Sequence, residues 1–122
     1  MERSQRQLRV AEQLRHVMTE TMRRGSFGDE ILFHYAPKIS ISEVRVSPDL
    51  KNATAFVSLL GDGDLDEVLP ALNDEHQEFQ KDIGQKLRLK FTPRVRFKYD
   101  ESIERVSRLD AILSNLPKSK DD

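Results

Sequence analysis

The stretch of sequence that does most to decide the fold runs from residue 84 to residue 102 and reads GQKLRLKFTPRVRFKYDES. Within it, residues 94–100 alternate between basic and apolar side chains, which is typical of a strand with one face in a core and the other in solvent. The apolar face carries Val95, Phe97 and Tyr99, and the basic face carries Arg94, Arg96 and Lys98. Pro93 ends the preceding helix, because the residue before a proline is disfavoured in the helical region.

Upstream of this strand, apolar residues at helical spacing predict a helix that begins after Asp64 and continues to about residue 90. Asp64 is a suitable N-cap, and Pro70 lies close enough to the start of the helix to be tolerated. The apolar stripe weakens over residues 73–76. We therefore expect a kink there, between two central helices.

Two further strands are predicted nearer the N-terminus. Residues 38–47 alternate in one phase up to Ile41 and in the opposite phase from Val44, so a bulge is expected near Ser42. A short polar turn then leads to a strand over residues 53–60. Because the connection is short, the two strands should form an antiparallel hairpin.

The two ends of the chain complete the pattern. Residues 4–24 read as an amphipathic helix, and residues 25–37 read as a loop with one short helical turn near Ile31. A last helix is expected after a cap at residues 100–102, and a polar tail follows from Pro117.

This order of elements predicts an α/β (α+β) fold with a three-stranded sheet and helices on one face. The order is helix, strand, strand, helix, helix, strand, with a C-terminal helix added. We assign residues 1–116 to a single domain and residues 117–122 to the polar tail.

Composition excludes several classes of protein. The 122 residues include no Cys, so neither a disulfide nor a thiolate metal site can form. Neither an apolar run long enough to cross a membrane nor a signal peptide is visible, and a cytoplasmic protein is expected. Because no catalytic, phosphate-loop or metal-ligand pattern occurs, we predict a protein that is not an enzyme and uses no cofactor, metal or small-molecule substrate.

The formal net charge of −1 conceals a segregation of charge along the chain. Residues 86–98 hold six bases and no acid, the first helix is rich in Arg, and residues 62–82 are acidic. Two converging basic surfaces could neutralise the phosphates of an RNA backbone. On a helix that continued to residue 90, Lys86 and Lys90 would lie one turn apart on one face. The candidate RNA-binding residues are Arg6, Arg9, Arg15, Lys86, Arg88, Lys90, Arg94, Arg96 and Lys98.

Taken together, these segments resemble the ribosome-binding factor A family. The resemblance rests on residues 84–102, the Arg-rich first helix, the turn Ser47-Pro48-Asp49-Leu50 and the Ala-x-Ala-x-Val strand after it, and it covers residues 5 to 113. It implies a type II KH-like domain that binds the small (30S) ribosomal subunit and its 16S rRNA late in assembly. It also implies roles in rRNA processing, ribosome biogenesis and cold adaptation, and no catalytic residues.

One departure from the family pattern lies between the two central helices. The family usually has a small Ala-x-Gly kink there, and this chain has Glu75-His76-Gln77 instead. The carboxylate of Glu75 would repel a phosphate that a glycine backbone could approach.

We therefore predict a monomeric small-subunit maturation factor that binds 16S rRNA through its basic run and first helix. One alternative is a generic single-stranded RNA-binding module, and another is a protein-interaction module that uses the acidic stretch. For base stacking, Phe97 and Tyr99 are assigned to the core, and Phe27 in the expected loop is preferred over Phe91.

Overall fold

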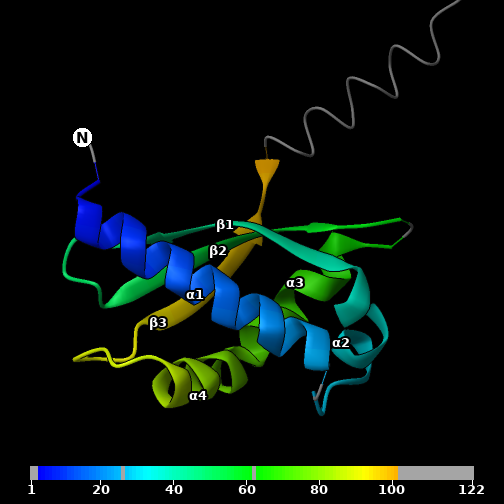
Figure 1. Cartoon of the computed structure of the whole chain (residues 1–122). Coiled ribbons are helices and arrows are strands. Elements are labelled where there is room, and N and C mark those ends of the chain that lie inside the picture. The colour runs from blue at the N-terminus through cyan, green and yellow to red at the C-terminus, as the bar shows by residue number, and fades with distance from the viewer. Residues whose placement is uncertain (1–2, 26, 62, 102–122) are drawn as a thin grey trace, which may run out of the picture.

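The computed structural model describes residues 3–25, 27–61 and 63–101 (Figure 1). The elements in these ranges are helix α1 (Gln5–Arg24), helix α2 (Glu30–Tyr35), a 3₁₀ turn (Ala36–Lys38), strands β1 (Ile39–Val46) and β2 (Asn52–Leu59), helices α3 (Leu65–Asp74) and α4 (His76–Lys86), and strand β3 (Arg94–Tyr99). The predicted mixed α/β fold is confirmed, including its order of helix, strand, strand, helix, helix, strand. The C-terminal helix and the polar tail expected from the sequence lie outside the described residues.

The sheet has the strand order β1-β2-β3. Strands β1 and β2 are antiparallel, and β3 runs parallel to β2. The expected bulge is confirmed, because the β1–β2 register shifts between Ile41 and Glu43. The shift returns Val44 and Val46 to the face that already holds Ile39 and Ile41, so all four side chains are buried together.

Helix α1 forms because one of its faces is apolar and both of its ends are capped. Ser4 accepts a hydrogen bond from the backbone N–H of Gln7, and the Gln7 side chain accepts one from the backbone N–H of Ser4, which is a capping box. Gly25 ends the helix in the left-handed region, with φ 63°. The predicted apolar face, including Leu14 and Met18, is buried against β1.

The core lies between the sheet and the helices α1, α3 and α4, which lie together on one face of the sheet in Figure 1. Its centre is aromatic: the ring centroids of Phe79 and Phe97 are 4.8 Å apart, and those of Phe27 and Phe79 are 5.5 Å apart. Phe27 is therefore 8% exposed, and the expectation that it stands free for base stacking is wrong. The short helical turn expected near Ile31 is confirmed as α2, and the 3₁₀ turn follows it. The segment folds back over the core, so Phe27, Leu32 and Ala36 are buried.

The central helices are confirmed with a break at the expected place. Glu75 has φ −98° and ψ 18° and stands between α3 and α4, so the chain bends here without a glycine or an alanine.

Helix α4 is shorter than predicted. It ends at Lys86, and Leu87 is already extended, because Leu87 and Leu89 pack against the core in the extended form. Lys86 and Lys90 therefore do not share a helix face.

Candidate nucleic-acid interface

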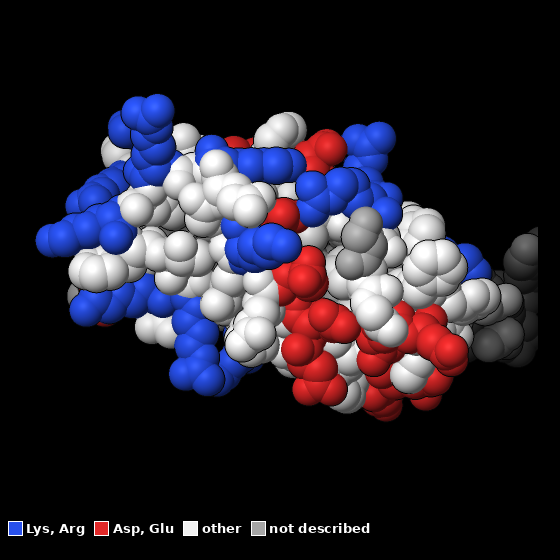
Figure 2. Space-filling model, turned by 90° about the horizontal axis from the view of Figure 1, so that it is seen from below, with Lys and Arg blue, Asp and Glu red and all other residues white. Residues whose placement is uncertain are grey.

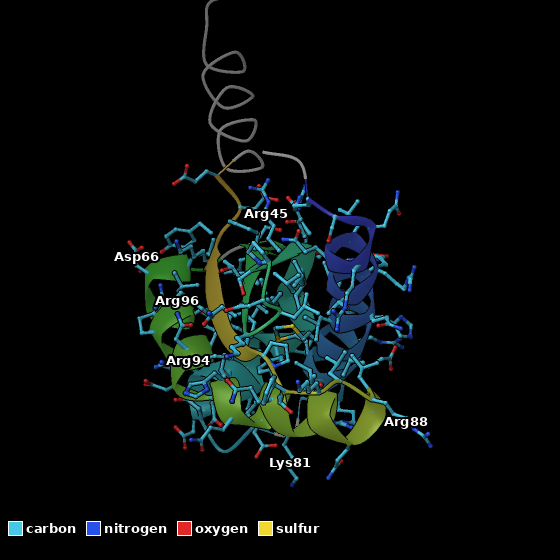
Figure 3. All side chains as sticks on the ribbon, turned by 90° about the vertical axis from the view of Figure 1, so that its left-hand side faces the viewer. Arg45, Asp66, Lys81, Arg88, Arg94 and Arg96 are labelled. Carbon is cyan, nitrogen blue, oxygen red and sulfur yellow. The ribbon has the colours of Figure 1, made fainter. Side chains whose placement is uncertain are left out.

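The basic side of β3 lies along a groove. Arg94, Arg96 and Lys98 are exposed on the face of the sheet opposite the helices, while Val95 and Phe97 are buried beneath them. The three cations line a groove of about 560 Å³ together with Asn52, Thr54, Asn73 and His76. Figure 3 shows Arg94 and Arg96 on the same side of β3. The sequence-predicted alternation thus produces a continuous cationic wall.

The junction between α3 and α4 forms the other border of this groove, because polar side chains tie it to the free edge of β3. The backbone N–H of Phe97 donates to Asn73 Oδ1 at 2.8 Å, and Asn73 Nδ2 donates to the carbonyl oxygen of Phe97 at 3.2 Å. From α4, Gln80 Oε1 accepts a hydrogen bond of 3.0 Å from the backbone N–H of Val95. His76 Nδ1 lies 3.0 Å from the same Gln80 oxygen. These amide groups replace the hydrogen bonds that a fourth strand would make.

The basic residues after α4 lie elsewhere. Arg88 is exposed at the end of α4 that is remote from Arg94 and Arg96, as Figure 3 shows. Leu87, one residue before it, lines a groove of about 510 Å³ with Arg9, Gln13 and His16 of α1. The structure therefore separates the basic run of the sequence into a group on β3, a group at the end of α4, and Lys90 in the segment between them.

Ion pairs divide the arginines of α1. Arg15 is bound by Glu12 through two hydrogen bonds of 2.8 and 2.7 Å, and Arg23 pairs with Glu20 at 3.2 Å. Arg6 and Arg9 are exposed and form no ion pair with another described residue. The same holds within the described ranges for Lys86, Arg88, Lys90, Arg94, Arg96 and Lys98. Among the described residues, eight of the nine predicted residues thus have no ion-pair partner, and Arg15 shares its charge with Glu12.

Arg45 joins the β3 group, although sequence reasoning missed it. It is exposed on β1 and pairs with Thr54 of β2, which pairs with Arg96 of β3. Arg45 and Arg96 therefore lie on the two sides of Thr54 on the same face of the sheet. Its Nε donates to Glu43 Oε2 at 2.9 Å, and this hydrogen bond lowers the pKa of Glu43 below its usual value. The signal was present in the sequence, because Arg45 lies between the inward-facing Val44 and Val46.

The acidic residues gather on a different part of the surface. In Figure 2, Lys and Arg gather toward the left of the view, and Asp and Glu gather at the lower right. The exposed acids include Asp64, Asp66 and Glu67 at the start of α3. Asp82 does not belong to this acidic surface, because it is buried between α4 and α1, where Thr21 Oγ1 donates to it at 2.6 Å and Arg24 forms an ion pair with it.

The described ranges lack the features of two other kinds of site. No cluster of His, Asp or Glu able to hold a metal ion occurs there. None of the helices in these ranges combines the length and the apolar character needed to cross a bilayer.

A small α/β fold with an exposed cationic sheet face is typical of nucleic-acid-binding modules. Residues 6–113 match the family model for ribosome-binding factor A. The ribosome-binding factor A of Mesorhizobium japonicum is 44% identical over 120 residues, which are 97% of this chain and 80% of that protein. The chain therefore belongs to the ribosome-binding factor A family. This is a family of ribosome-binding factors and not a known class of enzyme.

Solved structures of the family share the fold. The solution structure of a Thermotoga maritima protein proposed to be a ribosome binding factor A has a TM-score of 0.68 and 25% identity, with 85% of this chain and 95% of that chain covered. A homology model of the Thermus thermophilus ribosome binding factor A, fitted into a cryo-EM map of a complex with 30S, has a TM-score of 0.56 and 18% identity, with 75% and 91% of the two chains covered.

Proposed function

We propose that this protein is a cytoplasmic ribosome-binding factor that assists maturation of the 30S subunit by binding 16S rRNA. Membership of the ribosome-binding factor A family carries the proposal. The Thermus thermophilus relative that was fitted into a map of a complex with 30S supports the choice of subunit. The exposed cations that have no acidic partner among the described residues support the choice of rRNA as the contacted component.

The primary contact surface in this proposal is the groove lined by Arg94, Arg96 and Lys98. Side chains on alternate residues of a strand lie about 7 Å apart, which is close to the spacing of successive phosphates on an extended single strand. Arginine suits this role because its planar guanidinium binds phosphate through two hydrogen bonds. The second contact is the group at the end of α4, with Arg9 and Arg88.

The mechanism is positional. Phosphate contacts fix the orientation and register of a bound protein on a nucleic acid but carry no sequence information by themselves. Two separate basic groups on one rigid core would fix the relative position of two stretches of rRNA. The protein would thereby hold immature rRNA in one arrangement while the subunit matures.

The test is co-sedimentation with free small subunits, large subunits and whole ribosomes over a series of salt concentrations. The variant Arg94→Gln/Arg96→Gln/Lys98→Gln removes three charges without adding acids. For a single-stranded contact, the slope of log K against log salt should fall by about two. The matched control is Lys81→Gln, because Lys81 is an exposed cation of α4 that lies outside the groove.

Binding of the wild-type protein to free small subunits, with the triple variant reduced and the control unchanged, supports both the function and the surface. Equal binding of the wild-type protein to all particles would contradict the choice of subunit. Normal binding by a folded triple variant would contradict the choice of surface.

A further inference from the structure

Phe91 displays its ring to solvent in a segment that is otherwise anchored. It is 53% exposed, whereas Pro93 is buried and Leu87 and Leu89 pack against the core. The backbone N–H of Arg94 donates to the carbonyl oxygen of Lys51 at 2.8 Å, which ties the end of the segment to the β1–β2 turn. The turn and the segment lie at the same side of the molecule, at the left of Figure 1. The ring is therefore held in a defined place.

Two cations accompany this ring. Lys51 Nζ lies 5.3 Å from the ring centroid, and Lys90 Nζ lies 5.5 Å from it. The two lysines come from different parts of the chain and meet at Phe91 because of the tie between the turn and the segment. Neither lysine forms an ion pair with a described residue. The ring and the two ammonium groups therefore form one exposed cluster that combines an aromatic face with positive charge.

Phe33 shows what an ordinary exposed ring looks like in the same protein. It is 69% exposed on α2, and no cation lies over its ring among the described residues. Exposure alone therefore does not distinguish Phe91. The two lysines over its ring distinguish Phe91 from Phe33.

We propose that Phe91, Lys51 and Lys90 form a stacking site for one unpaired base of RNA, with the lysines on the adjoining phosphates. The inference rests on the proposed function and specifies the kind of rRNA element at this end of the molecule. Every base has a π-face that stacks on an aromatic ring, and a single-stranded segment leaves that face open. Lysine is a flexible point charge, so an ammonium displaced from the ring by a base remains within reach of a phosphate.

The Phe91 ring favours unpaired over base-paired RNA. In a duplex, the faces of the bases are covered by their stacked neighbours, so a ring on a protein surface gains nothing from them. The lysines alone would bind a duplex as readily as a single strand. A preference for single strands that depends on Phe91 therefore distinguishes the stacking site from a simple patch of positive charge.

The chain contains no Trp, so the variant Phe91→Trp carries a single fluorophore at the site. Titration with a single-stranded adenosine oligonucleotide at low salt should quench its fluorescence, and an RNA duplex of the same length should quench it much less. The matched control is Phe33→Trp, in which quenching should be absent. Absence of quenching at position 91, or equal quenching at positions 91 and 33, would overturn the site.

Affinity for the small subunit gives a second readout. Phe91→Leu should weaken binding by about tenfold, from the loss of one stacked base, whereas Phe91→Tyr should bind as the wild-type protein does. Thermal melting establishes that both variants are folded. If wild-type protein binds small subunits and Phe91→Leu binds equally well, the stacking site is wrong and the proposed function stands. If the wild-type protein fails to bind small subunits, the proposed function itself fails.

Discussion

The side-chain amide of Asn73 pairs with both backbone polar groups of Phe97, at 2.8 Å from the N–H and at 3.2 Å from the carbonyl oxygen. Asn73 of α3 thus acts on the free edge of β3 as a neighbouring strand would. The pairing fixes the distance between the helical junction and the basic strand. The width of the groove that contains Arg94 and Arg96 therefore depends on a residue that carries no charge.

Asn73→Ala should lower the free energy of unfolding by about 2 kcal/mol, because it leaves two partly buried backbone groups of β3 without their partners. Denaturant unfolding measures this loss, and amide hydrogen exchange at Phe97 should become faster. Gln77→Ala is the control, since Gln77 is exposed on the next helix. Equal losses for the two variants would show that the hydrogen bonds between Asn73 and Phe97 do not contribute to the free energy of unfolding.

Arg9→Gln and Arg15→Gln should differ in their effect on small-subunit binding, although both residues lie on α1. Arg9 forms no ion pair with a described residue, whereas Arg15 is bound to Glu12. Loss of one phosphate contact should lower the salt slope by about 0.7 for Arg9→Gln and leave it unchanged for Arg15→Gln. The same co-sedimentation series measures both. A larger effect at Arg15 would mean that Glu12 gives up its partner on binding.

Glu43→Gln should change stability in a manner that depends on pH. The hydrogen bond from Arg45 lowers the pKa of Glu43 in the folded state, so the ionised carboxylate stabilises the fold at neutral pH. This contribution is lost as the pH falls through the lowered pKa. At pH 7 the variant should be less stable than the wild-type protein by about 0.5 kcal/mol, as expected for an exposed pair.

Urea unfolding of the wild-type protein and of Glu43→Gln at several pH values tests this expectation. The difference between the two should vanish at a pH below the folded-state pKa of Glu43. A difference that stays constant from neutral to acid pH would assign the effect to packing and not to charge.

Asp82→Ala should lower the free energy of unfolding by about 2 kcal/mol, because the buried carboxylate joins α4 to α1 through Thr21 and Arg24. Asp82→Asn should lose less, since an amide oxygen can still accept from Thr21 Oγ1. Lys81→Ala, at the exposed neighbouring position, is the control. Thermal or chemical denaturation with circular dichroism gives all three values. A loss for Asp82→Ala no greater than that for Lys81→Ala would contradict the structural role.

The elements that sequence patterns predicted well are those whose periodicity is strong and local. The alternation over residues 94–100, the phase reversal near Ser42 and the apolar stripe of the first helix each have one structural solution that buries their apolar side chains. The fold follows from placing these faces together. The helical stripe predicts that α4 continues to about residue 90, because Leu87 fits its spacing. The helix in fact ends at Lys86, since Leu87 and Leu89 are two residues apart, as on one face of a strand, and both pack against the core.

The sequence by itself determined the order of the elements, the basic face of β3 and the family to which the chain belongs, because these depend on residue type and on spacing along one segment. Tertiary structure alone decided which charges act together. It divided the basic run between β3, the end of α4 and the segment between them. It also placed Arg45 across the sheet from Arg96, put Arg9 in a groove with Leu87, and buried Asp82 beside Arg24. It also buried Phe27 and left Phe91 exposed beside Lys51 and Lys90. The physical reason is that exposure and pairing depend on neighbours brought from distant parts of the chain, and no periodicity within one segment records them.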